Sequence, residues 1–185
     1  MNNATDPAQA VHTELVAWLN AAASTSKLFE HPISKTSDES LEARYKVSGE
    51  RVPGAKAILI KMGMRDAPDS FAVIVLPGSN LLDSKTLKRE LRTRVPGMHS
   101  FRFATPEEMA QKARGMQPGK MPPFGRPIFP DVAFTFIDQA LLDHKRVGFN
   151  AAHFERSIII DTEEYLRLVT HDGIFACSVE VAQQA

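Results

Sequence analysis

The sequence predicts an α+β fold: a single domain in which a mixed, largely antiparallel and curved sheet of about six to seven strands is surrounded by helices. Two observations lead to this class. Strand patterns occur in consecutive groups, with helical patterns between only some of them, rather than in the regular alternation of a doubly wound fold. The 185-residue chain also contains no internal repeat and no low-complexity linker. We therefore expect one domain over residues 1–185, with residues 1–30 as a helical N-terminal extension.

The first part of the chain predicts two helices and a short strand. An Asp-Pro pair at residues 6 and 7 is typical of a helix start, and apolar residues then recur at helical spacing as far as residue 23. We expect a short strand within residues 27–34. A second helix follows over residues 37–46, beginning at Ser37 or Asp38.

A hairpin and a helix come next. The segments AKAILIKM (55–62) and SFAVIVLPG (70–78) are strong strand patterns, and the turn-rich residues between them predict an antiparallel hairpin. Residues 84–94 have a charged helical pattern, in which Leu87 and Leu91 form the inward pair.

The second half of the chain contains local signals of the same kinds. Residues 101–104 predict a short strand, and residues 105–115 predict a helix because Thr105 and Glu108 have the spacing of a capping box. The C-terminal third predicts three strands, a helix capped by Asp161 with Glu164, and a last strand, over residues 132–138, 145–152, 156–161, 162–169 and 174–182 respectively.

The composition is that of an ordinary globular protein. Hydrophobic residues make up 43% and charged residues 24%, with 22 basic and 22 acidic side chains, which excludes disordered and fibrous classes. A net charge of zero argues against a protein that coats nucleic acid, although a local basic patch can still dock one RNA end. No apolar run approaches the roughly 20 residues of a membrane span. We expect a cytoplasmic protein with no membrane contact.

Cysteine and histidine spacing gives no support for a metal site. Cys177 is the single cysteine, and no Cys/His pair has zinc-ligand spacing. Cys177 lies in an apolar strand pattern, which favours a buried and inert thiol. The dipeptide at His171 and Asp172 is better explained by a cap or a surface feature than by a metal pair. We expect no metal and no other cofactor.

The segment MQPGKMPPFGRPIFP at residues 116–130 is a rigid and apolar loop. Proline fixes φ and removes a donor, and glycine opens conformations closed to other residues, so this loop has a fixed shape. In one interpretation Pro122, Pro123 and Phe124 form a rigid plug that packs over the sheet and has no role in ligand binding. In the other, Gly119 lets the backbone approach a ligand, and Pro123 fixes the loop so that free N–H groups point into a pocket.

Lys56 is a cation on an apolar strand face. Period-2 alternation places Lys56 on the same face as Ile58 and Ile60, and Lys61 on the other. Either Lys56 sits at the strand start and extends to solvent, or it lies at the lip of a cleft and binds a phosphate or carboxyl oxygen.

Other candidate groups carry weaker signals. No GxSxG, P-loop, HExxH or GxGxxG motif occurs. Asp138 and Asp143 are better explained as turn and cap residues than as a carboxylate pair. The spacing of His153 does not decide between a pocket and the surface.

Several segments together resemble the YbaK/EbsC family, the stand-alone relatives of the editing domain of bacterial prolyl-tRNA synthetases. The matching segments occur in the family's order and cover most of the chain after residue 30: EHPIS (30–34), GAKAILIKM (54–62), AVIVLPG (72–78), ATPEEM (104–109), GMQPGKMPPFG (115–125), FTFIDQALL (134–142) and GFNAAHFERSIIID (148–161).

The resemblance implies an aminoacyl-tRNA deacylase, which hydrolyses the ester of a mischarged tRNA such as Cys- or Ala-tRNA(Pro). It implies that Lys56 orients the acylated 3′ end and that Gly119 and Pro123 are the ends of a GxxxP loop, with Met121 and Pro122 between them, whose backbone holds the substrate. It places His153 in the segment that lines the aminoacyl pocket. Where this sequence has Ala152, the family usually has glycine, so either the backbone there accepts a Cβ or the pocket is narrower.

The expected partners follow from the same resemblance. They are the aminoacylated 3′ end of tRNA and, as a second possibility, an aminoacyl-tRNA synthetase. Basic side chains should contact the RNA, with Arg44, Lys46, Lys112, Arg114, Lys120 and Arg126 as candidates. An activated ester needs no Ser or Cys nucleophile, so the missing triad is no objection. The alternative function is a non-catalytic module that binds an aminoacyl-like ligand or docks to a synthetase.

Overall fold

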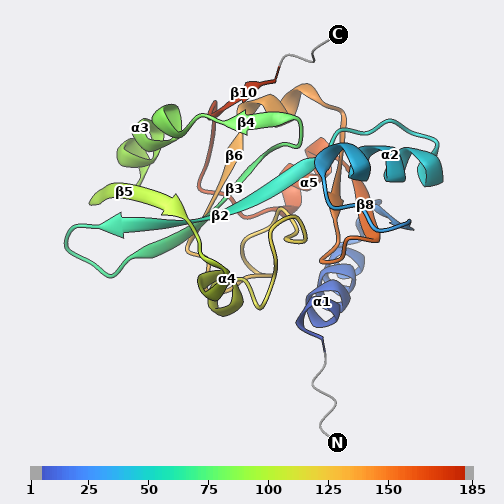
Figure 1. Cartoon of the computed structure of the whole chain (residues 1–185), viewed down its shortest axis with the longest axis horizontal. Helices are drawn as coiled ribbons and strands as arrows, with labels where there is room; N and C mark the ends of the chain where they lie inside the picture. The colour runs from blue at the N-terminus through green and yellow to red at the C-terminus, as the bar shows by residue number, and fades with distance from the viewer. Residues whose placement is uncertain (1–5, 182–185) are drawn as a thin grey trace, which may run out of the picture.

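The computed structural model describes residues 6–181 (Figure 1). The helices are α1 (Pro7–Ala21), α2 (Ser37–Ser48), α3 (Ser84–Arg94), α4 (Pro106–Lys112) and α5 (Thr162–Leu168), with one 3-10 turn, η1 (Gln139–Asp143). The strands are β1 (Lys27–Glu30), β2 (Ala55–Met64), β3 (Ser70–Pro77), β4 (Asn80–Leu82), β5 (Met98–Phe103), β6 (Phe134–Asp138), β7 (Arg146–Asn150), β8 (Arg156–Asp161), β9 (Gly173–Phe175) and β10 (Ser178–Glu180).

The predicted α+β class and the mixed, largely antiparallel sheet are confirmed. The main sheet has the order β5-β2-β3-β6-β9, in which β5, β2 and β3 are antiparallel and the β3–β6 and β6–β9 pairs are parallel. A second sheet has the order β1-β8-β7, and β4 pairs with β10 in a two-stranded ribbon. An isolated bridge between Gly54 and Gly148 brings the start of β2 next to β7.

Strand β3 separates two hydrophobic cores. Because successive side chains on a strand point to opposite faces, Val73 and Val75 enter one core together with α1 and the proline-rich loop. Ile74 and Leu76 enter the other, where they meet Leu87 of α3. The near-continuous burial of β3 explains why its sequence reads as an apolar run without polar alternation.

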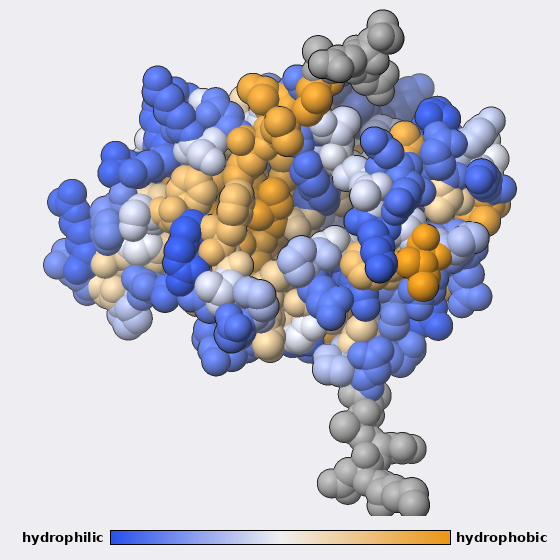
Figure 2. All heavy atoms as spheres, in the orientation of Figure 1, coloured by the Kyte–Doolittle hydropathy of each residue, from blue (hydrophilic) through white to orange (hydrophobic). Residues whose placement is uncertain are grey.

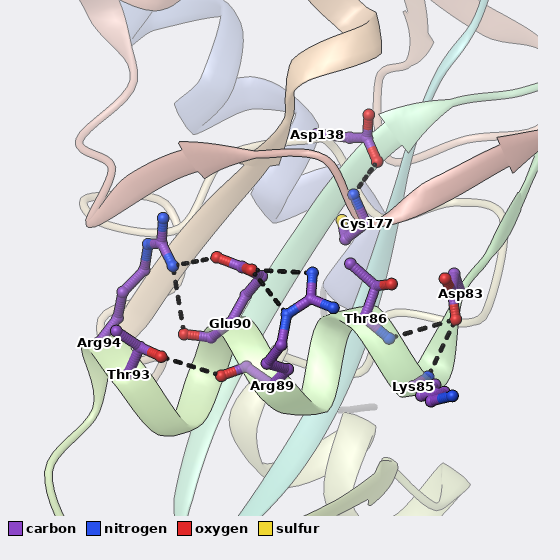
Figure 3. Close-up of polar contacts among 9 residues, drawn as sticks. All are labelled: Asp83, Lys85, Thr86, Arg89, Glu90, Thr93, Arg94, Asp138 and Cys177. Carbon is purple, nitrogen blue, oxygen red and sulfur yellow. Dashed lines mark hydrogen bonds and ion pairs between the residues drawn. The ribbon is translucent and has the colours of Figure 1, made fainter.

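Side-chain caps fix the starts of four helices, α1 through Asp6 and also α2, α3 and α4. Thr105 and Glu108 form the predicted capping box of α4. Asp83 begins α3, where its carboxylate accepts hydrogen bonds from the N–H groups of Lys85 and Thr86 at 3.0 and 3.2 Å (Figure 3). Helix α2 begins at Ser37, as predicted, and the residue that caps it is Thr36, which forms a capping box with Glu39.

The predicted cap of α5 is right in position but wrong in its interactions. Asp161 occupies the cap position but its side chain makes no capping hydrogen bond. Its carboxylate instead lies 3.1 Å from Nε of Arg146. Glu164 accepts hydrogen bonds from Thr25, outside the helix, so both carboxylates of the expected pair serve tertiary contacts.

The last predicted strand is broken into two. The pattern over residues 174–182 covers β9 and β10, which belong to different sheets, and residue 182 lies outside the described residues. The chain turns at Cys177, whose N–H donates to Asp138 at 2.9 Å (Figure 3) and whose carbonyl accepts from Asp83. The ten strands within residues 6–181 exceed the predicted six to seven, in part because the three-residue β4 was not predicted and the last predicted strand is divided into β9 and β10.

The face shown in Figure 2 is mainly polar, apart from an apolar band and smaller apolar groups. Figure 2 shows apolar residues extending from the β4–β10 ribbon toward the centre of the face in view. Leu81 and Val179 of this ribbon are exposed, as is Val181, which directly follows β10. Within residues 6–181, no helix combines the length and the apolar character that crossing a membrane would require.

Candidate functional site

A cavity of about 300 Å³ opens between the start of β2, the end of β3, one face of α2, β7 and the proline-rich loop. This volume is at the lower end of the range for small-ligand sites, roughly 300–1,000 Å³. Its wall is formed by Lys35, Thr36, Ser37, Ser40, Arg44, Gly54, Ala55, Lys56, Ala57, Ile58, Leu59, Gly78, Phe103, Ala104, Met109, Pro118, Gly119, Met121, Gly148 and Asn150.

Lys56 lies in this wall with its ammonium group held in place. Nζ donates hydrogen bonds to the carbonyl oxygens of Gly78, at 3.1 Å, and Asn80, at 2.5 Å. The side chain is half-buried, and burial lowers the pKa of the ammonium group from its ordinary value. An ammonium group has three N–H donors, so two are used by the protein and one is left for a ligand.

The proline-rich loop contributes its first half to the cavity. Pro118, Gly119 and Met121 line the wall, and Asn150 donates to the carbonyl of Gly119 at 2.7 Å. Gly119 has φ +83°, and a Cβ there would lie 3.2 Å from the ring of Phe154. Within residues 6–181, the backbone N–H groups of Gly119 and Met121 donate to no other backbone group. This part of the loop therefore has the form expected of a segment whose backbone approaches a ligand.

The second half of the loop packs into the core. Pro122, Pro123 and Phe124 are buried and are not among the residues that line the cavity. The carbonyl of Pro123 accepts a hydrogen bond from the buried hydroxyl of Tyr165 at 2.5 Å. The ring of Phe124 makes edge contacts with Trp18, Phe149 and Tyr165. The two interpretations of the loop thus describe different halves of it.

Ala152 and His153 lie outside the cavity wall. Ala152 is completely buried and has φ +66°, a left-handed conformation that glycine adopts without strain. A Cβ is therefore accepted at this position, in a strained backbone. His153 is 8% exposed and its ring meets that of His12 edge-on at 5.5 Å. The structure therefore brings Lys56, Gly119 and Met121 together in the cavity wall. The other predicted site residues do not line the cavity: Ala152, His153, Pro122 and Pro123.

The conformation of Ala152 leads to a first prediction. Ala152→Gly should leave the free energy of unfolding unchanged or raise it by up to about 1 kcal/mol, because relief of roughly 1–2 kcal/mol of left-handed strain exceeds the extra flexibility of the unfolded chain. Urea unfolding measures this. Ala151→Gly is the matched control, since Ala151 is equally buried without a positive φ, and it should lose about 1 kcal/mol. Equal losses in both variants would contradict the strain at Ala152.

The buried histidine pair leads to a second prediction. Burial, and next the charge of Arg156, lower the pKa of His153 below its usual 6.5, and its Nε2 has no hydrogen-bond partner. As the pH falls below 6.5, the unfolded chain binds a proton here that the folded chain does not, so the free energy of unfolding should fall. Urea unfolding at pH 8 and pH 5.5 should show this decrease. His153→Gln should make it smaller, and an unchanged decrease would exclude His153 as a source.

One face of α2 forms a wall of the cavity that the sequence patterns did not reveal. Ser37, Ser40 and Arg44 follow helical spacing and all line the cavity. Arg44 is 2% exposed, although the sequence placed it among surface residues for RNA contact. Its side chain lies against two glycines: a Cβ on Gly54 would come within 3.2 Å of Nη2, and a Cβ on Gly148 within 2.6 Å of Nε. The 37/40/44 spacing was the available signal.

The other basic candidates lie elsewhere. None of Lys46, Lys112, Arg114, Lys120 and Arg126 lines the cavity. Lys120 lies beside the loop, with Nζ 4.9 Å from the centre of the Phe154 ring. Arg114 pairs with Glu14 at 2.6 Å. Lys46 and Arg126 are exposed.

The remaining polar candidates have structural roles. Asp138 accepts hydrogen bonds from the N–H groups of Ala140 and Cys177, and Asp172 accepts from that of Thr135. Cys177 is 1% exposed, and burial raises the pKa of its thiol. Among the residues that the structure describes, no group of three His, Cys, Asp or Glu side chains is placed to hold a metal ion.

The chemical character of the cavity is cationic and partly apolar. Lys35, Arg44 and Lys56 line it, and none of the described lining residues is Asp, Glu or His. Hydroxyl groups are present, but without a neighbouring base they are not activated nucleophiles. Such a site can bind an anionic ligand and stabilise negative charge that develops on an oxygen atom.

The fold and the cavity thus define an α+β domain with a cationic ligand site. Residues 31–168 match the family model of the aminoacyl-tRNA editing domain. The chain belongs to this family, and the resemblance seen in the sequence is confirmed. No curated protein matches the chain.

Two solved structures share the fold. A protein proposed to be a trans-editing enzyme for prolyl-tRNA synthetase has 21% identity and a TM-score of 0.67, with 96% of this chain and 99% of that chain covered. The hypothetical protein APE2540 has 20% identity and a TM-score of 0.68, with 90% and 99% covered. At these identities the likeness shows the fold alone.

Proposed function

We propose that this protein is a trans-editing hydrolase that deacylates mischarged aminoacyl-tRNA, with Cys- or Ala-tRNA(Pro) as the substrate class. The observation that carries the proposal is the convergence of Lys56 and Gly119 on one cavity, whose described lining residues include no nucleophile–base pair. Such a wall fits a substrate that is already activated, as an aminoacyl ester is. The family supplies the general activity, and the protein of similar fold described above supports the link to prolyl-tRNA synthetase.

The geometry gives each group a role. The free N–H of Lys56 and the unpaired backbone N–H groups of Gly119 and Met121 can donate to the ester. Water adds to the ester carbonyl, and the negative charge that develops on its oxygen is stabilised by these donors. The bond to the ribose oxygen then breaks, and that oxygen takes the proton lost by the water. A neighbouring tRNA hydroxyl or an ordered water relays the proton.

The apolar part of the wall supports a small acyl group. Ala55, Ala57, Met109 and Met121 line the cavity, and their side chains offer no hydrogen-bond partner to a polar side chain. An alanyl or cysteinyl side chain would leave no buried charge unpaired there. Basic residues beyond the wall, including Lys120 and Arg126, would contact the RNA, and binding should weaken as salt rises.

A panel of tRNAs tests the proposal. Purified protein is incubated with Ala-tRNA(Pro), Cys-tRNA(Pro) and correctly charged Pro-tRNA(Pro), and the remaining ester is measured over time against buffer alone. Faster loss of at least one mischarged ester, with Pro-tRNA(Pro) spared, is the expected result. A binding module would protect the esters or leave their decay unchanged, and that outcome would replace the hydrolase with the binder.

A further inference from the structure

The guanidinium of Arg44 is an unpaired charge inside the cavity wall. The residue is 2% exposed, and its Nε has no hydrogen-bond partner within the described chain. Burial alone lowers its pKa, to about 10, with no charged neighbour acting on it. The guanidinium is therefore still charged at neutral pH. Leaving a buried charge without a partner is costly, so a cavity that keeps one is suited to a ligand that supplies the counter-charge.

No acidic side chain among the described lining residues of the cavity supplies a counter-ion to Arg44. The cavity wall carries Lys35 and Lys56 as further cations and none of the described lining residues is acidic. The carboxylate of Glu39, at the start of α2, accepts hydrogen bonds from the N–H groups of Lys35 and Thr36 at 2.7 and 3.2 Å. Glu39 therefore caps the start of α2. The group in this wall that lacks a negatively charged partner is the guanidinium of Arg44.

Two glycines make room for this arrangement. A Cβ on Gly54 or Gly148 would lie 3.2 Å or less from the Arg44 side chain. The bridge between these glycines closes the wall behind the guanidinium. Arg44 is therefore held on a fixed backbone surface, from which a planar guanidinium can bind two oxygens of one carboxylate or phosphate.

We propose that Arg44 is the anion-binding residue of this cavity and holds an oxyanion of the substrate. The inference rests on the proposed function only for the origin of that oxyanion. On an aminoacyl-tRNA there are two sources. One is the phosphate of the terminal adenosine, which every substrate carries. The other is a carboxylate on the acyl side chain, which alanyl and cysteinyl groups lack, so carboxylate binding would replace the proposed substrate class with aspartyl and glutamyl esters. Both present the same geometry to a guanidinium, and Lys56 remains available for the ester.

Ligand titrations test the site without any deacylation assay. Adenosine 5′-monophosphate, adenosine and glutarate are added separately to the wild-type protein, and the amide signals of Gly54 and Gly148 are followed by NMR. If the phosphate is the source, adenosine 5′-monophosphate should bind about tenfold or more tightly than adenosine. If a carboxylate is the source, glutarate should shift these signals. No shift with any of the three probes would overturn the proposal.

Arg44→Lys tests the residue itself, because lysine keeps the charge but cannot bind two oxygens in one plane. Binding of the effective probe should weaken about tenfold. In deacylation, KM should rise with kcat nearly unchanged, for every aminoacyl-tRNA if the phosphate is bound and only for aspartyl and glutamyl esters if a carboxylate is. Arg89→Lys, an exposed residue outside the wall, is the control. Unchanged probe binding in a folded Arg44→Lys protein would refute the role of Arg44. If that variant does not fold, the wild-type titrations decide.

Discussion

Lys56→Met should lower kcat for deacylation by about a hundredfold or more, the cost expected when one donor to a developing oxyanion is removed. Methionine keeps much of the apolar stem in the wall but loses the ammonium group. The hydrogen bonds from Nζ to Gly78 and Asn80 are lost as well, so some destabilisation is expected. Single-turnover deacylation at saturating protein separates the chemical effect from any change in binding.

Lys61→Met is the matched control for Lys56. Lys61 lies on the same strand but outside the cavity wall, where it pairs with Asp69 at 3.1 Å and Glu108 at 3.4 Å. The substitution is again lysine to methionine. It should leave kcat within about twofold of the wild-type value, because the Lys61 side chain is remote from the ester. Full activity in Lys56→Met, or an equal loss in Lys61→Met, would remove Lys56 from the mechanism.

Gly119→Ala should reduce both the stability of the protein and its activity. At φ +83° an L-residue is strained by roughly 1–2 kcal/mol, and the new Cβ would press against the Phe154 ring at 3.2 Å. The loop must shift, and Gly119 and Met121 shift with it at the cavity wall. We expect KM to rise about tenfold, since small displacements of a positioning backbone are costly. Steady-state kinetics and urea unfolding measure the two effects.

Gly49→Ala distinguishes backbone strain from the effect at the site. Gly49 ends α2 with φ +74°, and no atom lies within 4 Å of a Cβ built there. It should show a similar loss of stability with unchanged kinetics. If Gly49→Ala raises KM as much as Gly119→Ala does, the loss of activity is a consequence of lower stability and the loop has no special role.

Local signals in the sequence were sufficient for most of the fold. The β2–β3 hairpin has two long apolar strands joined by a turn-rich segment, and the capping box of α4 depends on two residues three positions apart. Both signals lie within a few residues of the structure that they specify. The break between β9 and β10 could not be predicted in this way, because Asp138 and Asp83 hold Cys177 from distant parts of the chain.

The candidate site was predictable only in part for the same reason. Lys56 and Gly119 stand out locally, as a cation on an apolar strand and a glycine in a rigid loop. The burial of Arg44 depends on Gly54 and Gly148, which lie in strand regions far apart in the sequence and meet only in the folded protein. The positions of Ala152 and His153 behind the wall likewise depend on how β7 and β8 pack against α1.

The proposal that this protein hydrolyses mischarged aminoacyl-tRNA is tested most directly by the number of tRNA molecules deacylated per protein molecule. Mischarged Ala-tRNA(Pro) and Cys-tRNA(Pro) are each supplied in large excess over the protein, and free tRNA is counted after correction for spontaneous hydrolysis. A cavity that catalyses hydrolysis should turn over many molecules of at least one substrate, and Lys56→Met should slow this turnover about a hundredfold or more. If the release of free tRNA stops at one equivalent of protein, or never exceeds the spontaneous rate for either tRNA, the protein is not a catalyst of this hydrolysis.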